Sequence, residues 1–88
     1  MNYKTQHRKM SKKEKLEKII DALNGAIAEY GYFIIEMQDR CYIYGKKFKI
    51  DYVWTEPYVY VVNESGKEYA IVKIKNITQI NPGPFFRK

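Results

Sequence analysis

Apolar residues in the first third of the chain recur three or four positions apart, which is the spacing of an amphipathic helix: Leu16, Ile19, Ile20, Leu23, Ile27 and Tyr30. Ser11 and Glu14 have the spacing of a capping box, so a helix should begin at Ser11. Gly31 is the expected stop, although the Asn24-Gly25 pair offers an earlier end. We predict a helix over residues 11–30.

From residue 32 onward the apolar positions alternate instead, with β-branched and aromatic residues in the majority. Residues 58–62 and 69–74 form the clearest pair of strands. The turn between them is Asn-Glu-Ser-Gly, in which Gly66 can adopt the left-handed conformation and Asn63 can bond the local backbone. A hairpin alone cannot bury its apolar face, so the other segments must cover it.

Three further segments complete the predicted sheet. Residues 32–38 form the first strand, and residues 41–44 resume strand character either after a bulge or as a short hairpin strand. Residues 48–54 alternate, which places on the inner face Phe48, Ile50, Tyr52 and, if the alternation continues, Trp54. After the hairpin, a helical turn near residues 75–77 and a short final strand would bury Ile77 and Ile80.

The length of 88 residues suits a single small domain. We divide the chain into a basic flexible arm (residues 1–10), a folded domain (residues 11–80) and a C-terminal tail (residues 81–88). The net charge of +6 is concentrated at one end: the first 18 residues hold seven basic and two acidic side chains, and the rest hold nine and eight. Such an asymmetry is typical of a segment that binds nucleic acid or an acidic protein surface.

Residue types that support catalysis are scarce. Cys41 is the single cysteine and His7 the single histidine, so neither a disulfide, a cysteine-built metal site nor a Ser-His-Asp or Cys-His arrangement is expected. We predict a protein that is not an enzyme and carries no metal or cofactor. No apolar run reaches the roughly 20 residues of a membrane span, so we expect a cytoplasmic protein without a membrane partner.

One helix cannot cover both the face and the edges of a five-strand sheet, and a small barrel with the helix at one end solves this problem. We therefore predict a mainly β (α+β) fold. The run of residues 49–82, with its bent strand, Tyr/Val strand, four-residue turn and ending IKNITQINP, resembles the Sm-like barrels. That family includes the bacterial RNA chaperone and the YolD-like proteins of phage-rich genomes. An SH3-like barrel and an open sheet packed on one helix are the alternatives.

The resemblance implies a function as well as a fold. Sm-like proteins bind RNA as rings and stack bases between two loops, which implies a homo-oligomer. In this chain the matching loops contain Trp54 and Tyr58 in the first and Lys75 and Asn76 in the second.

The basic residues have a physical role of their own. Arg8, Lys9, Lys12 and Lys13 can neutralise phosphates and release counterions without reading sequence. Equally, such lysines can serve only as a solvated helix face, and a single tryptophan in a small chain is commonly part of the core.

Our hypothesis is a nucleic-acid-binding barrel that prefers RNA or single strands. The alternative is a small phage or mobile-element protein that binds and inhibits or modulates a larger host protein; an exposed Trp54 favours the first, a buried one the second.

Overall fold

The computed structural model describes residues 11–81 and begins with helix α2, Lys12–Tyr30. Both bonds of the capping box are present: the backbone N–H of Glu14 donates to Ser11 Oγ at 3.1 Å, and the N–H of Ser11 donates to Glu14 Oε1 at 2.9 Å. Gly31 ends the helix with a left-handed φ of 82° and donates to the carbonyl of Ile27. The predicted start and stop are confirmed, and the Asn24-Gly25 pair does not end the helix.

Six strands and one 3-10 turn follow the helix. They are β1 Phe33–Met37, β2 Tyr42–Gly45, β3 Lys47–Val53, β4 Glu56–Val62, β5 Glu68–Lys73, the turn η1 Ile74–Asn76 and β6 Ile77–Ile80. The strands form two antiparallel sheets with the orders β2-β1-β6 and β3-β4-β5.

A mainly β (α+β) fold with one N-terminal helix is therefore confirmed. Residues 42–45 are a hairpin strand paired with β1, and the helical turn before the last strand is present. The expected closed barrel of five strands is not found within residues 11–81, which hold six strands in two separate sheets. The physical reason is a bend: the chain turns at Lys46, the one residue between β2 and β3, and passes there from one sheet into the other.

Gly45 lies at this bend and is buried. A Cβ atom at this position would lie 2.7 Å from Cζ of Phe33 and 2.5 Å from Cγ1 of Val61. The chain therefore needs a residue without a side chain where it leaves the first sheet and enters the second.

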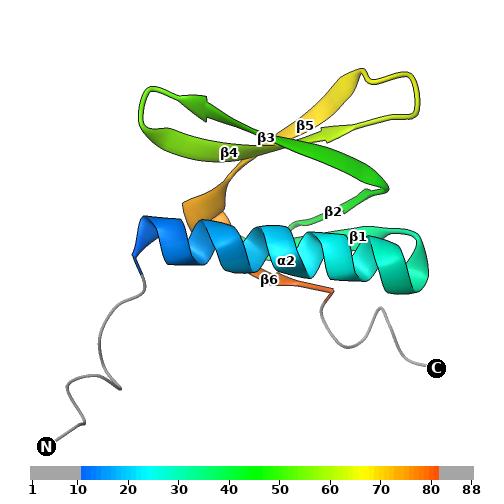
Figure 1. Ribbon diagram of the computed structural model, residues 1–88, viewed down its shortest axis with the longest axis horizontal. Helices are drawn as coiled ribbons and strands as arrows, with labels where there is room; N and C mark the ends of the chain where they lie inside the picture. The colour runs from blue at the N-terminus through cyan, green and yellow to red at the C-terminus, as the bar shows by residue number, and fades with distance from the viewer. Residues whose placement is uncertain (1–10, 82–88) are drawn as a thin grey trace, which may run out of the picture.

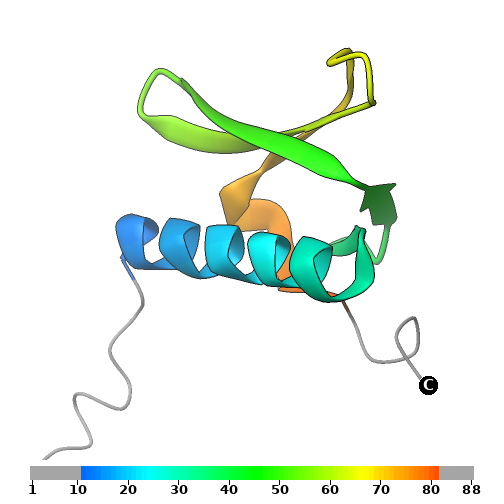
Figure 2. The ribbon, with the colours of Figure 1, turned by 45° about the vertical axis from the view of Figure 1, so that its right-hand side comes forward.

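The core lies between the helix and the two sheets. In Figure 1, α2 runs along one side of the molecule and the β3-β4-β5 sheet lies on the opposite side, and Figure 2 shows the same arrangement after rotation. The fully buried side chains come from all three layers: Leu23, Phe33, Ile35, Val59, Val61 and Val72. On the helix, Ala26 is buried and Ile20 only half-buried, so the buried face is rotated slightly from the predicted stripe.

The predicted β4-β5 hairpin is present, with its reversal at residues 63–66. Gly66 has a φ of 87°, and Oδ1 of Asn63 accepts bonds from the backbone of Ser65 and Lys67. Between Val61 and Val62 the register shifts by a bulge, which no sequence pattern predicted.

Two residues placed on the inner face of residues 48–54 are exposed instead. Phe48 and Ile50 pack against the core as expected, whereas Tyr52 is 54% and Trp54 93% exposed. The prediction was wrong for these two because the β3-β4 hairpin extends beyond the core, and its turn interrupts the alternation at Trp54.

Two glycine substitutions test this packing in opposite directions. Gly45→Ala should lower the free energy of unfolding by about 1–3 kcal/mol, because the new methyl group overpacks the bend. Gly25→Ala should raise it by about 0.5–1 kcal/mol, because Gly25 is a helical residue whose added Cβ meets nothing within 4 Å. Denaturant unfolding measures both values, and a Gly45→Ala variant as stable as the wild type would contradict the close approach.

Candidate nucleic-acid interface

Trp54 occupies the tip of the β3-β4 hairpin. Val53 pairs with Glu56, so Trp54 and Thr55 alone make the turn. Two-residue hairpin turns require a positive φ at their first position, where glycine or asparagine is usual. Trp54 has a φ of 60° there. A bulky residue in this region of backbone space is an outlier, and strain of this kind concentrates at functional sites.

A groove separates the hairpin from the start of the helix. Figures 1 and 2 both show the β3-β4 turn lying over the first turns of α2. The groove has a volume of about 380 Å³ and is lined by both elements. Its helix side presents Lys12, Lys13 and Leu16, and its hairpin side presents Tyr52 and Pro57. An aromatic ring and two ammonium groups therefore face the same space.

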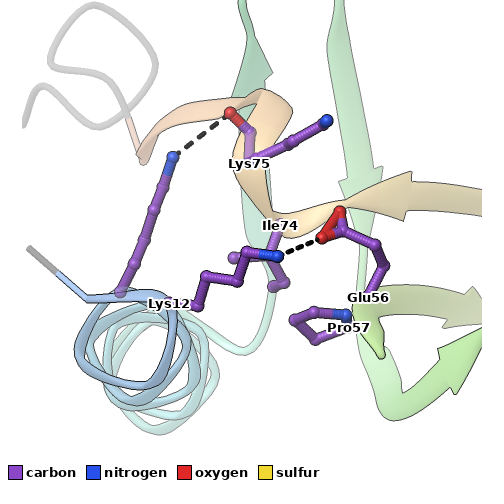
Figure 3. Close-up of a pocket in the computed structure, with 6 residues that line it drawn as sticks. Lys12, Glu56, Pro57, Ile74 and Lys75 are labelled. Carbon is purple, nitrogen blue, oxygen red and sulfur yellow. Dashed lines mark hydrogen bonds and ion pairs between the residues drawn. The ribbon is translucent and has the colours of Figure 1, made fainter. Parts of the chain in front are cut away.

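A smaller pocket continues from this groove toward η1. Nζ of Lys12 lies 2.9 Å from Oε2 of Glu56, and Figure 3 shows this pair beside Pro57, Ile74 and Lys75. Nζ of Lys15 donates to the carbonyl of Lys75 at 3.3 Å. The start of α2, the start of β4 and η1 are thus joined by polar contacts above an apolar floor.

The electrostatics of the pocket follow from its lysines. The hydrogen bond that Lys12 donates holds the pKa of Glu56 below its ordinary value, against the effect of partial burial. The charges of Lys12, Lys75 and Lys73 act in the same direction. The place that the Glu56 carboxylate occupies is therefore favourable for a negative charge.

Four of the predicted site residues gather at this end of the molecule: Lys12, Lys13, Trp54 and Lys75. Two do not join them. Tyr58 lies half-buried on the face of β4 that points away from the core, next to Tyr60 at 6.4 Å between ring centroids. Asn76 is half-buried, and its carbonyl accepts from the backbone of Gln38 at 2.9 Å. Arg8 and Lys9 lie outside the described residues.

Three members of the site lie outside the set of eight residues predicted for it. Lys15 follows Lys12 by three positions, so helical spacing alone could have placed it on the same face. Tyr52 was assigned to the inner face, and that face turns out to open onto the groove where the core ends. Glu56 offered no signal, since its partner Lys12 is 44 positions away in the chain.

Other kinds of site are not evident in the part of the chain that the structure describes. Within residues 11–81, no group of three or more His, Cys, Asp or Glu side chains could hold a metal ion. The only helix in this range, α2, is not apolar enough to cross a membrane.

The chain matches no protein-family model, and neither the curated proteins nor the solved structures include a match to it. A function can therefore be proposed only from the geometry of the molecule itself.

The Lys12 to Glu56 contact predicts a measurable titration. In NMR spectra recorded against pH, the side-chain carboxyl of Glu56 should titrate at lower pH in the wild type than in Lys12→Met, because the variant lacks the donor that stabilises the carboxylate. Lys18→Met removes a lysine of the exposed helix surface and should leave the midpoint unchanged. Equal midpoints in the wild type and Lys12→Met would contradict the contact.

Proposed function

We propose that this protein binds single-stranded nucleic acid, RNA in preference, through the surface formed by the β3-β4 turn and the start of α2. The observation that carries the proposal is the exposure of Trp54, which is 93% accessible to solvent. Unpaired bases stack on aromatic rings, whichever base is present, so such a platform suits binding without sequence preference.

The position of Trp54 supports a role in binding more than one in folding. A tryptophan that served the core would bury its ring and satisfy its N–H group. This ring contributes little to the core, and it stands at a turn position whose backbone favours a smaller residue. A strained and exposed aromatic side chain is understandable if a ligand covers it.

The second component of binding is charge. Lys12 and Lys13 line the groove beside Tyr52, and Lys75 lines the adjoining pocket. Arg8 and Lys9 precede them in the chain by a few positions and add to the same basic segment. Lysines and arginines that neutralise phosphates provide affinity that depends on salt but not on sequence. Stacking and phosphate contacts together are the usual means by which proteins hold single strands.

We further propose that the two sheets are the halves of a small barrel of the Sm-like or SH3-like kind. Three features support this: β2 and β3 are separated by Lys46 alone, η1 precedes the last strand, and the sheets enclose one core. Within residues 11–81, β5 pairs only with β4 and β6 only with β1, so each leaves an edge for another chain. These edges support a homo-oligomer.

Replacing the tryptophan tests the stacking. Trp54→Ala should weaken binding to a short single-stranded oligouridylate by about 1–3 kcal/mol, measured by fluorescence anisotropy of the labelled strand. Trp54→Phe should retain part of the affinity because it keeps a ring. Tyr44→Ala, which removes an exposed ring near the opposite end of β3, is the control and should bind as the wild type does.

The same titration has an intrinsic readout. Trp54 is the single tryptophan of the chain, so its fluorescence should be quenched when the strand binds. Binding without quenching, together with an unaffected Trp54→Ala variant, would contradict the platform. If neither RNA nor DNA single strands bind at low salt, the alternative function replaces this proposal. The surface would then bind a larger host protein, and the lysines would contact an acidic groove of that protein.

Deleting residues 1–10 tests the contribution of their positive charges to binding. The deletion removes Lys4, Arg8 and Lys9 and leaves the capped helix in place. The slope of log affinity against log salt should become shallower by roughly 0.7 for each lost contact, or about 2 if all three bind phosphates. The unfolding midpoint should be unchanged. A loss of affinity without a change of slope would mean that the arm acts through contacts other than phosphates.

A further inference from the structure

The pocket beside Lys12 already holds an anion of the chain itself, the carboxylate of Glu56. The Lys12 side chain is 74% exposed and the Glu56 side chain 26% exposed, so the carboxylate is the more enclosed partner of the pair. Lys75 lines the same pocket, and the charges of Lys75 and Lys73 reach the carboxylate from η1 and β5. Lys12 therefore contacts the carboxylate directly, and two further lysines from separate elements add a favourable positive charge.

A carboxylate oxygen and a phosphate oxygen are equivalent acceptors for a lysine ammonium group. The separation of 2.9 Å between Lys12 Nζ and Glu56 Oε2 is that of a charge-assisted hydrogen bond, and a phosphate oxygen would accept at a similar distance. The pocket adjoins the groove below the β3-β4 turn, since Lys12 and Pro57 line both. A strand that stacks on Trp54 would carry a backbone phosphate close to this position.

We propose that this pocket is a phosphate subsite of the single-strand interface, and that Glu56 occupies it in the free protein as an intramolecular competitor. When the strand binds, its phosphate takes the place of the carboxylate on Lys12, and Glu56 turns toward solvent. The inference rests on the proposed function and adds to it a residue that weakens binding: Glu56 makes the affinity of the free protein lower than its lysines alone would provide.

The exchange is feasible because the bond that must break is weak. Pairs in which one side chain is exposed change an equilibrium by only about 1.4- to 5-fold. Glu56 is the first residue of β4, next to the turn, so its side chain can leave the pocket while the core positions of that strand stay in place. The helix start does not provide a competing site at Ser11, because its capping box already uses the backbone N–H groups of Ser11 and Glu14.

Removing the competitor tests the proposal. Glu56→Gln keeps the shape of the side chain and releases Lys12, so binding of a short oligouridylate should become about 1.4- to 5-fold tighter than in the control. The slope of log affinity against log salt should change little, because the same phosphate contacts Lys12 in both complexes. The control is Glu17→Gln, which removes the same charge from the adjoining groove; Glu17 forms no ion pair within residues 11–81.

The same substitution in the Lys12→Met variant distinguishes the release of Lys12 from a general gain in positive charge. In Lys12→Met, the change Glu56→Gln should have no more effect than Glu17→Gln has, since no ammonium group is left to release. Two results would overturn the role of Glu56 as a competitor while the proposed function stands. One is that Glu56→Gln binds no tighter than Glu17→Gln, and the other is that Glu56→Gln tightens binding equally with and without Lys12. If the wild type and Glu56→Gln both fail to bind at low salt, the proposed function itself is overturned.

Discussion

The ring of Phe33 occupies the space that a side chain at position 45 would need, since a Cβ atom there would lie 2.7 Å from its Cζ atom. Phe33 also meets Phe48 edge to face, with 5.9 Å between ring centroids. The same ring therefore contacts the end of β2 and the start of β3. The bend at Gly45 and Lys46 brings the second sheet across the core from the helix, and the position of the candidate interface depends on it.

One consequence of the bend is the position of the β3-β4 hairpin. Seven-residue strands are longer than the core beneath them, so the end of the hairpin extends past it and lies over the start of α2. Tyr52 keeps the inward side of its strand but faces the groove there, and Trp54 stands at the tip in solvent. Phe48 and Ile50, which pack against the core, are thus followed on the same hairpin by two aromatic residues of the candidate interface.

The second consequence is electrostatic. The helix begins with a capping box that satisfies its own backbone, which leaves its lysine side chains to interact with other elements. Lys12 pairs with Glu56, and Lys15 reaches η1. Because these contacts are partly exposed, they contribute little to stability and are open to competition from a stronger anion. The same pair that joins the helix to the hairpin is therefore suited to regulate access of a phosphate.

The sequence by itself determined the helix and its two ends, the hairpin over residues 58–74 and the 3-10 turn before the last strand. These depend on interactions between residues a few positions apart, such as the bonds between Ser11 and Glu14 or those of Asn63 with its own turn. Only the tertiary structure decided the exposure of Trp54, the pairing of Lys12 with Glu56 and the distribution of the strands over two sheets. Each depends on where the core ends or on which distant segment lies opposite, and alternation along one strand contains no information about either.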